Sequence, residues 1–109
     1  MDLFPMTTIC KCVVTDLDGT LWDGVLGEDG LAGLRVRPGH QDLQAELVTL
    51  HSRGVALAVA SKNDLGDVQT AFATLPNMVL GWQHLTAWRV GWQDKPSALR
   101  GIATDLGYG

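Results

Sequence analysis

The stretch "KCVVTDLDGTLWDG", residues 11–24, places two aspartates one residue apart where an apolar run breaks into a glycine-bearing turn. The residues before Asp16 are apolar and β-branched, so we predict a buried strand there. Residues i and i+2 of an extended segment point the same way, so Asp16 and Asp18 are expected to project into one site. Aspartates also end strands and cap turns for purely structural reasons, and the pair alone leaves that alternative open.

The rest of the chain alternates between glycine-rich, helical and extended patterns. Apolar residues recur at i, i+3, i+4 and i+7 in the helical segments and form short β-branched or apolar runs in the extended ones. In chain order we first expect a loop or small hairpin at 19–37 that forms a flap, then a helix between Pro38 and Gly54 and a strand at 55–60. The next helix should be capped by Ser61 or Asn63 and stopped by Pro76. A short strand at 78–80, an extended edge piece at 88–92 and a helix from Lys95 to Gly107 complete the chain.

This order predicts an α/β fold, with a parallel sheet and helices packed on both of its faces. A chain of 109 residues is long enough for one core and too short for two, so we expect residues 1–109 to form a single domain. Ligands of such sheets bind beyond the carboxyl ends of the strands. Asp16 and Ser61 both stand at that end of a predicted strand.

Composition limits the partners. The formal net charge is −4, and lysines and arginines are scattered singly, so we expect no nucleic acid. No apolar run approaches the length of a membrane span, and the opening residues lack a secretory signal. The sequence therefore predicts a soluble, cytoplasmic protein with no membrane partner.

The residues at the strand ends suit phosphate chemistry. Carboxylates as close as Asp16 and Asp18 repel unless a cation sits between them, and Mg²⁺ takes one or two protein carboxylates with phosphate and water. A carboxylate can act as a nucleophile that forms an aspartyl-phosphate, while a second one moves protons. The Ser61 hydroxyl and the Lys95 ammonium can bind phosphoryl oxygens. We therefore expect a phosphorylated small-molecule substrate and a Mg²⁺ cofactor.

Three short motifs resemble those of a known superfamily. "DLDGT" at 16–20, "SKND" at 61–64 and "WQDKPSALRGIA" at 92–103 are similar, in that order, to motifs one to three of the haloacid-dehalogenase-like (HAD) phosphotransferases. Two longer stretches, "KCVVTDLDGTLWDGVLGEDG" and "MVLGWQHLTAWRVGWQDK", resemble the FkbH-like branch of subfamily IIIC, which is found beside polyketide synthases. The resemblance implies a three-layer sandwich around a Rossmann-like HAD sheet.

For function, the resemblance implies a Mg²⁺-dependent enzyme that takes a glyceryl unit from 1,3-bisphosphoglycerate, removes phosphate and loads glyceryl onto an acyl carrier protein for extender-unit biosynthesis. Asp16 would be the nucleophile and a metal ligand. Asp18 would be the general acid/base and would offer its backbone carbonyl to Mg²⁺. Thr20, Ser61 and Lys95 match the remaining motif positions and would bind the substrate phosphate.

One departure from the family pattern leaves an alternative open. Family members continue into a strand that ends in an acidic pair, the fourth motif, whereas this sequence stops at Gly109, so we expect a partial core domain without its last strands. The alternative function is a catalytically inactive fragment or a docking module for a carrier protein. Arg35 and Arg37 are the visible basic candidates for that docking.

Cysteine, histidine and tryptophan residues carry structural expectations. We expect Cys10 and Cys12 to be reduced and buried, and therefore too unreactive to carry an acyl group. The histidines have no ligand spacing, and the default for every tryptophan is core or edge packing. These residues are His40, His51 and His84, and Trp22, Trp82, Trp88 and Trp92.

Overall fold

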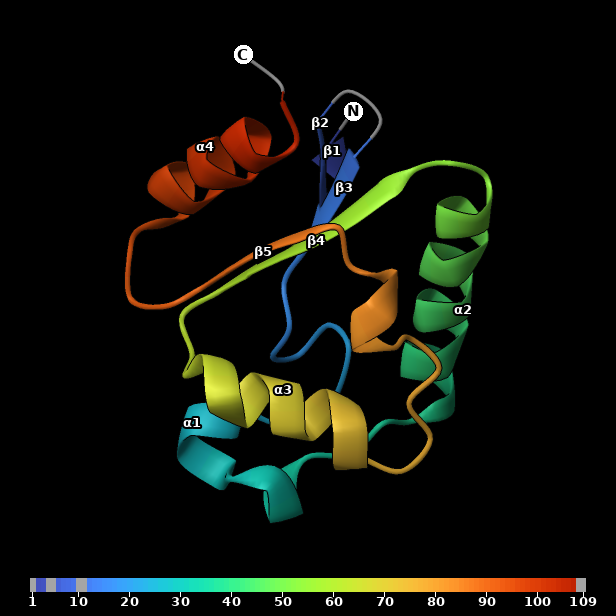
Figure 1. The fold of residues 1–109 in the computed structure, drawn as a ribbon. Coiled ribbons are helices and arrows are strands. Elements are labelled where there is room, and N and C mark those ends of the chain that lie inside the picture. Colours follow the sequence, from blue (N-terminus) through green and yellow to red (C-terminus); the bar gives the residue numbers. More distant parts are fainter. Residues whose placement is uncertain (1, 4–5, 10–11, 108–109) are drawn as a thin grey trace.

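A computed structural model describes residues 2–3, 6–9 and 12–107, and the described strands form one sheet (Figure 1). Its strand order is β1-β2-β3-β4-β5. The central strand β3 pairs in parallel with β4, and β4 pairs in parallel with β5, whereas β1 and β2 are antiparallel. The strands span Asp2–Leu3 (β1), Met6–Ile9 (β2), Cys12–Thr15 (β3), Ala56–Ser61 (β4) and Ala87–Val90 (β5). The sequence did not predict β1 and β2.

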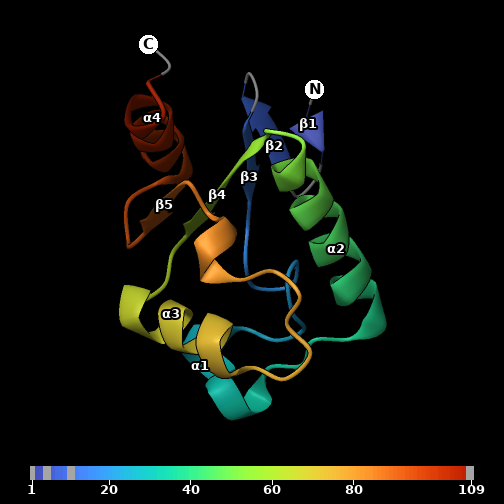
Figure 2. The ribbon, with the colours of Figure 1, turned by 45° about the vertical axis from the view of Figure 1, so that its right-hand side comes forward.

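Helices cover both faces of this sheet. Helix α4 lies on one face, and α2 and α3 lie on the other, as the two views in Figures 1 and 2 show. The helices span Leu26–Asp29 (α1), Pro38–Ser52 (α2), Leu65–Thr74 (α3) and Lys95–Asp105 (α4), with 3₁₀ turns at Leu31–Gly33 and Trp82–His84. The predicted three-layer α/β fold is therefore confirmed.

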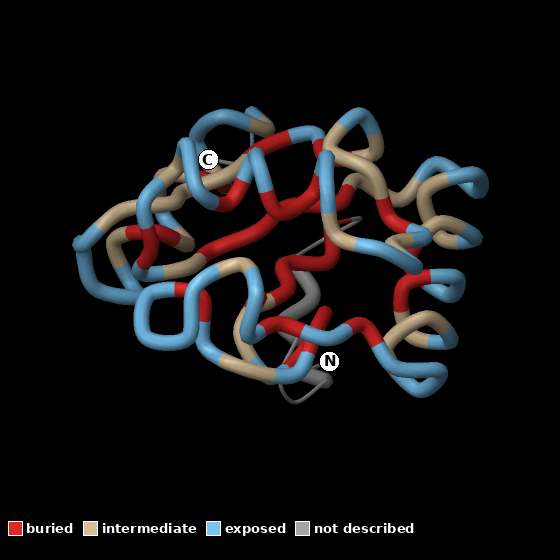
Figure 3. The backbone as a smooth tube through the Cα atoms, turned by 90° about the horizontal axis from the view of Figure 1, so that it is seen from below, coloured by how far each residue is buried: buried red, intermediate tan, exposed pale blue. Residues whose placement is uncertain are grey.

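Two hydrophobic clusters, one on each face, hold the layers together. Val13, Leu57 and Val59 point toward α2 and α3, while Val14 and Ala58, the neighbours of these residues along the strands, point toward α4. A strand covered on both faces needs apolar residues at successive positions, which explains why β3 and β4 lack polar alternation. The buried backbone accordingly runs through the middle of the molecule (Figure 3).

Helix α3 corrects one sequence prediction. Val68, Ala71 and Phe72 are buried, as the spacing predicted. The cap, however, is Asp64, whose Oδ1 accepts a hydrogen bond from the backbone N–H of Asp67 at 3.0 Å. Capping by Ser61 or Asn63 was wrong, because the Asn63 side chain instead donates hydrogen bonds to Asp18 and Ser61.

The predicted strand at 78–80 was also wrong. The amide oxygen of the buried Gln44 accepts hydrogen bonds from the backbone N–H groups of Val79 and Leu80, at 2.8 and 2.9 Å. A side chain on α2 thus satisfies backbone groups that a sheet would otherwise pair. The third parallel strand is β5, which overlaps the piece at 88–92 that was predicted only as an extended edge.

The segment 19–37 folds back on itself. The backbone groups of Asp23 and Arg35 exchange two hydrogen bonds, at 2.8 and 3.1 Å, and the Arg37 guanidinium pairs with the Asp23 carboxylate at 3.0 Å. These contacts close the segment at its base, and α1 within it lies beside α3 in Figures 1 and 2.

None of the described helices is long and apolar enough to cross a membrane.

Candidate active site

A cleft of about 310 Å³ opens at the carboxyl ends of the parallel strands, below the start of α4. The strand register explains its floor. Val14, Ala58 and Ala87 are aligned across the sheet, so the next residues on that face are Asp16, Ala60 and Arg89. The residues that line the cleft are Asp16, Asp18, Ala60, Ser61, Lys62, Arg89, Gln93, Lys95 and Ala98.

Asp16 follows β3 directly and presents one carboxylate oxygen to the cleft. Its Oδ1 accepts a hydrogen bond from the backbone N–H of Leu17 at 2.9 Å. Its Oδ2 lies 3.8 Å from the Nζ of Lys95, and the side chain is 41% exposed. One oxygen is therefore fixed by the backbone while the other is open to a substrate and faces a cation.

Asp18 is held by three N–H donors. Its Oδ1 accepts from the Trp22 indole Nε1 and from the Leu26 backbone, each at 3.0 Å, and its Oδ2 accepts from Asn63 Nδ2 at 3.0 Å. Trp22 is fully buried and packs edge-on against Phe72. The Asp18 carboxylate thus ties the segment 19–37 to the end of β4 and has one fixed orientation.

Asn63 is a site residue that the sequence analysis did not find. It is 3% exposed, and its Nδ2 also lies 2.8 Å from the Ser61 Oγ. The one available signal was its position two residues after Ser61, in the stretch "SKND". The sequence analysis interpreted Asn63 there as a helix cap.

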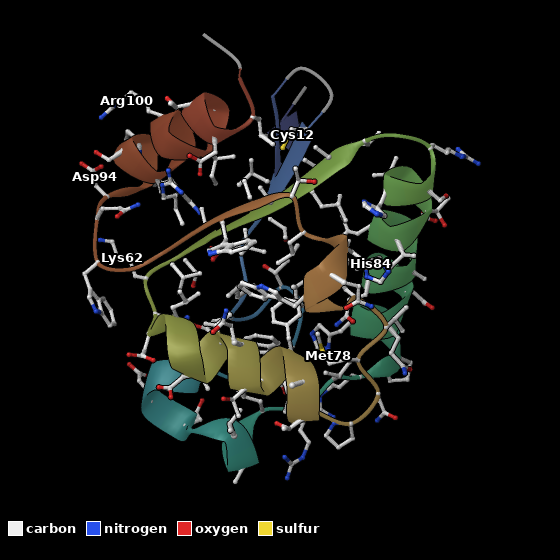
Figure 4. The ribbon with its side chains drawn as sticks, in the orientation of Figure 1. Cys12, Lys62, Met78, His84, Asp94 and Arg100 are labelled. Atoms are coloured by element: carbon white, nitrogen blue, oxygen red, sulfur yellow. The ribbon has the colours of Figure 1, made fainter. Side chains whose placement is uncertain are left out.

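Lys95 begins α4, as predicted, and its ammonium reaches across to Asp16. Asp94 caps the helix by accepting a hydrogen bond from the Ser97 backbone N–H at 2.9 Å. The hydrogen bonds from Ser97 hold the pKa of Asp94 below its usual value, and nearby cations including Lys62 add to this effect. Figure 4 shows Lys62 and Asp94 on the same side of the molecule, near the loop that joins β5 to α4.

The structure therefore brings together four of the five residues that the sequence singled out: Asp16, Asp18, Ser61 and Lys95 line one cleft. Thr20 is not among the lining residues. It is 7% exposed, and its backbone N–H donates to the Leu17 carbonyl at 3.0 Å within the turn.

The remaining candidates lie away from the cleft. Burial raises the pKa of the Cys12 thiol to about 11, and Cys10 lies outside the described residues. His84 accepts a backbone hydrogen bond at Nδ1 and packs edge-on against His51, and neither residue lines the cleft. Trp92 is 74% exposed, so the packing predicted for it was wrong.

The residues present fit Mg²⁺ in a limited way. Asp16 offers a carboxylate at the cleft, and Asp18 can offer its backbone carbonyl while three N–H donors hold its carboxylate in place. Among the described residues, no group of three or more histidine, cysteine, aspartate or glutamate side chains could hold a metal ion. Mg²⁺ usually keeps several waters and binds one or two protein carboxylates plus substrate phosphate, so this donor set is compatible with it.

Comparison with known proteins supports this assignment of the fold. No protein-family model matches the chain, and no curated protein does. A similar solved structure is the N-terminal part of the protein BF1531 from Bacteroides fragilis, which contains a phosphatase domain and is complexed with Mg. The TM-score is 0.85 at 32% sequence identity, and the match covers 91% of this chain and 28% of that one. The α/β fold is that of this solved phosphatase domain, and the chain spans less than a third of the solved chain that it matches.

Proposed function

We propose that this chain is a Mg²⁺-dependent phosphatase or phosphotransferase that works through an aspartyl-phosphate on Asp16. The observation that carries the proposal is the Asp16 carboxylate itself, since its Oδ2 is open to the cleft and lies 3.8 Å from the Lys95 ammonium. The similarity to a solved phosphatase domain supports the same class of activity.

The proposed reaction has two steps. The Asp16 Oδ2 attacks the substrate phosphorus, the bond from phosphorus to the leaving oxygen breaks, and protonated Asp18 gives that oxygen its proton. Water then attacks the phosphorus of the aspartyl-phosphate, Asp18 takes a proton from the water, and the bond to Asp16 breaks to release inorganic phosphate. Both steps need Asp18 at one fixed place, which its three N–H donors provide.

The other residues bind the transferred group. Lys95 and Ser61 line the cleft beside Asp16 and would hold phosphoryl oxygens through the ammonium and the hydroxyl. The Asp16 oxygen that does not attack, Oδ1, and the backbone carbonyl of Asp18 would hold Mg²⁺, which would supply positive charge that lets an anionic phosphate approach a carboxylate. The phosphate contact of Thr20 stays a prediction, because Thr20 is buried in the turn.

The finer proposal is the FkbH-like reaction, in which the chain removes phosphate from a glyceryl unit of 1,3-bisphosphoglycerate that is destined for an acyl carrier protein. It rests on the resemblance of residues 11–30 and 78–95 to that branch. We assign the phosphate-removal step to this chain and not an acyl-enzyme step on Cys12, because Cys12 is fully buried and its thiol pKa is raised to about 11.

The basic residues suggested for docking of a carrier protein are engaged within the chain. Arg37 pairs with Asp23, and Arg35 donates from Nη1 to the carbonyls of Ala32 and Leu34. Contacts within the chain thus take up part of the charge of Arg37 and part of the hydrogen-bond donors of Arg35 that a carrier protein would need. This favours an enzyme over a docking module.

The test is magnesium-dependent hydrolysis of an aryl phosphate by the purified chain. We expect turnover with Mg²⁺, loss of turnover in EDTA, recovery on adding Mg²⁺, and none of this in Asp16→Asn. For the finer proposal, 1,3-bisphosphoglycerate replaces the aryl phosphate, and we expect the chain to release inorganic phosphate from it only when Mg²⁺ is present. Carrier binding without metal-dependent hydrolysis would replace the enzyme proposal by the docking module.

A further inference from the structure

The side chain of Asn63 contacts two residues of the candidate active site at once, and it lies in the interior of the molecule. Its Nδ2 lies 3.0 Å from Asp18 Oδ2 and 2.8 Å from Ser61 Oγ, and only 3% of the residue is exposed. We propose that Asn63 is a positioning residue that aims both Asp18 and Ser61 at the reacting phosphate. This inference rests on the phosphatase function proposed above.

The chemistry of the neighbours fixes the orientation of the amide. An ionised carboxylate only accepts hydrogen bonds, so the NH₂ group of Asn63, and not its oxygen, must face Asp18. The NH₂ group carries two hydrogens, one for each of its two neighbours. The amide oxygen lies on the other side, toward Gly27, 3.9 Å from where a Cβ on that glycine would stand. Each half of the amide therefore has a distinct place.

For Ser61 the consequence is the direction of its hydroxyl hydrogen. A serine hydroxyl has one hydrogen to donate and lone pairs that accept. Because Ser61 Oγ already accepts from Asn63, its own hydrogen is free to point into the cleft, which Ser61 lines. Without Asn63, that hydrogen could turn to the neighbouring Asp18 carboxylate, and a phosphoryl oxygen would lose a donor.

For Asp18 the consequence is that Oδ2 is the oxygen left to move protons. Trp22 and Leu26 both donate to Oδ1, whereas Asn63 is the one donor to Oδ2 among the residues that the structure describes. Asn63 thus sets the place of Oδ2 while leaving it a free lone pair. Its removal should therefore affect the proton-transfer step more than the nucleophilic attack by Asp16.

The test compares Asn63→Ala with wild type on two substrates, an aryl phosphate with a good leaving group and an alkyl phosphate with a poor one. Loss of a partner that orients a catalytic group typically costs on the order of 10–100-fold in activity. We expect that loss for the alkyl phosphate, whose leaving oxygen needs the proton, and a clearly smaller one for the aryl phosphate. We also expect Asn63→Ala to raise the KM when Ser61 is present. The same change should leave the KM unaltered when it is made in Ser61→Ala, because Asn63 acts on phosphate through Ser61.

Gln44→Ala is the matched control. Gln44 is likewise a buried amide that bonds to several groups, but its partners are Leu21, Val79 and Leu80, away from the cleft. It should lower the thermal stability without changing the ratio of rates on the two substrates. If Asn63→Ala behaves like Gln44→Ala, Asn63 is merely structural and the proposal is overturned.

The two proposals fail in different ways. Wild-type hydrolysis with an unchanged substrate ratio in Asn63→Ala overturns the role of Asn63 alone, whereas absence of wild-type hydrolysis overturns the proposed function and this role with it. If Asn63→Ala does not fold, nuclear magnetic resonance of the Asn63 side-chain amide gives the answer. Asp18→Asn and Ser61→Ala should each shift its two proton signals, and signals that move in neither variant contradict the assignment.

Discussion

The ammonium of Lys95 lies 3.8 Å from Asp16 Oδ2, so this pair joins the start of α4 to the end of β3 across the cleft. Both side chains are about half exposed, at 53% and 41%. Exposed ion pairs contribute little to folding because water and salt screen them. We therefore interpret the pair as part of the reaction site and not as a support of the fold.

Lys95→Met should cripple catalysis and leave stability nearly unchanged. Removal of one preorganised donor in a site of this kind costs on the order of 10²–10³ in rate. Steady-state kinetics and a thermal melt measure the two quantities. Arg53→Met, an exposed change at the end of α2, is the control for loss of a positive charge, and it should leave the rate as it is. Equal kinetics in Lys95→Met and Arg53→Met would make Lys95 an ordinary surface residue.

Asp18→Asn should slow the release of phosphate more than its capture. The proposed nucleophile, Asp16, remains, but the carboxylate proposed to take a proton from the attacking water is gone. With an aryl phosphate that needs little proton donation, labelled phosphoenzyme should build up to a higher fraction than in wild type. An acid quench followed by filter binding measures it. Normal turnover with no retained label would give Asp18 another role.

Ile102→Ala should destabilise the fold by about 2–5 kcal/mol, the usual cost of a large-to-small change in a core. Ile102 is fully buried between α4 and the sheet, against Cys12, Val14 and Ala58. Urea unfolding gives the free energy, and the exposed Thr104→Ala on the same helix is the control. A loss no greater than in Thr104→Ala would mean that α4 is not packed on this face.

Cys12 should make the folded state less stable as pH rises from 9 to 11. Burial raises the thiol pKa from 9.0 to about 11, so above pH 9 the unfolded thiol ionises while the folded one stays protonated. The unfolded state then binds fewer protons, and the free energy of unfolding falls with pH. Cys12→Ala should lose part of this slope in urea unfolding at several pH values. Identical slopes in the two proteins would contradict the burial of the thiol.

Sequence could predict the strands and helices whose formation depends on the pattern of apolar residues within the element itself. The apolar run before Asp16 and the helical spacing of Val68, Ala71 and Phe72 each specify a buried face, and the structure has both. The strand at 78–80 failed because a distant side chain, Gln44 on α2, takes up its backbone N–H groups. No local pattern reports a partner that far away in the sequence.

In the candidate site, too, sequence predicted the residues that local structure places and missed the one that a distant contact places. Asp16, Asp18, Ser61 and Lys95 could be found because strand ends and helix starts place them at one edge of a parallel sheet. Asn63 could not, because its role depends on a pairing of side chains across 45 positions of the sequence. The sequence offered a simpler local use for it, as a helix cap, and that use belongs to Asp64.

The most direct test of the central claim is to find the residue that carries phosphate during turnover. The chain is mixed with radiolabelled aryl phosphate and Mg²⁺, quenched in acid and digested, and the labelled peptide is sequenced by mass spectrometry. We expect phosphate on Asp16, and no labelled peptide from Asp16→Asn. Label on a different residue, or steady hydrolysis by Asp16→Asn at the wild-type rate, would contradict it.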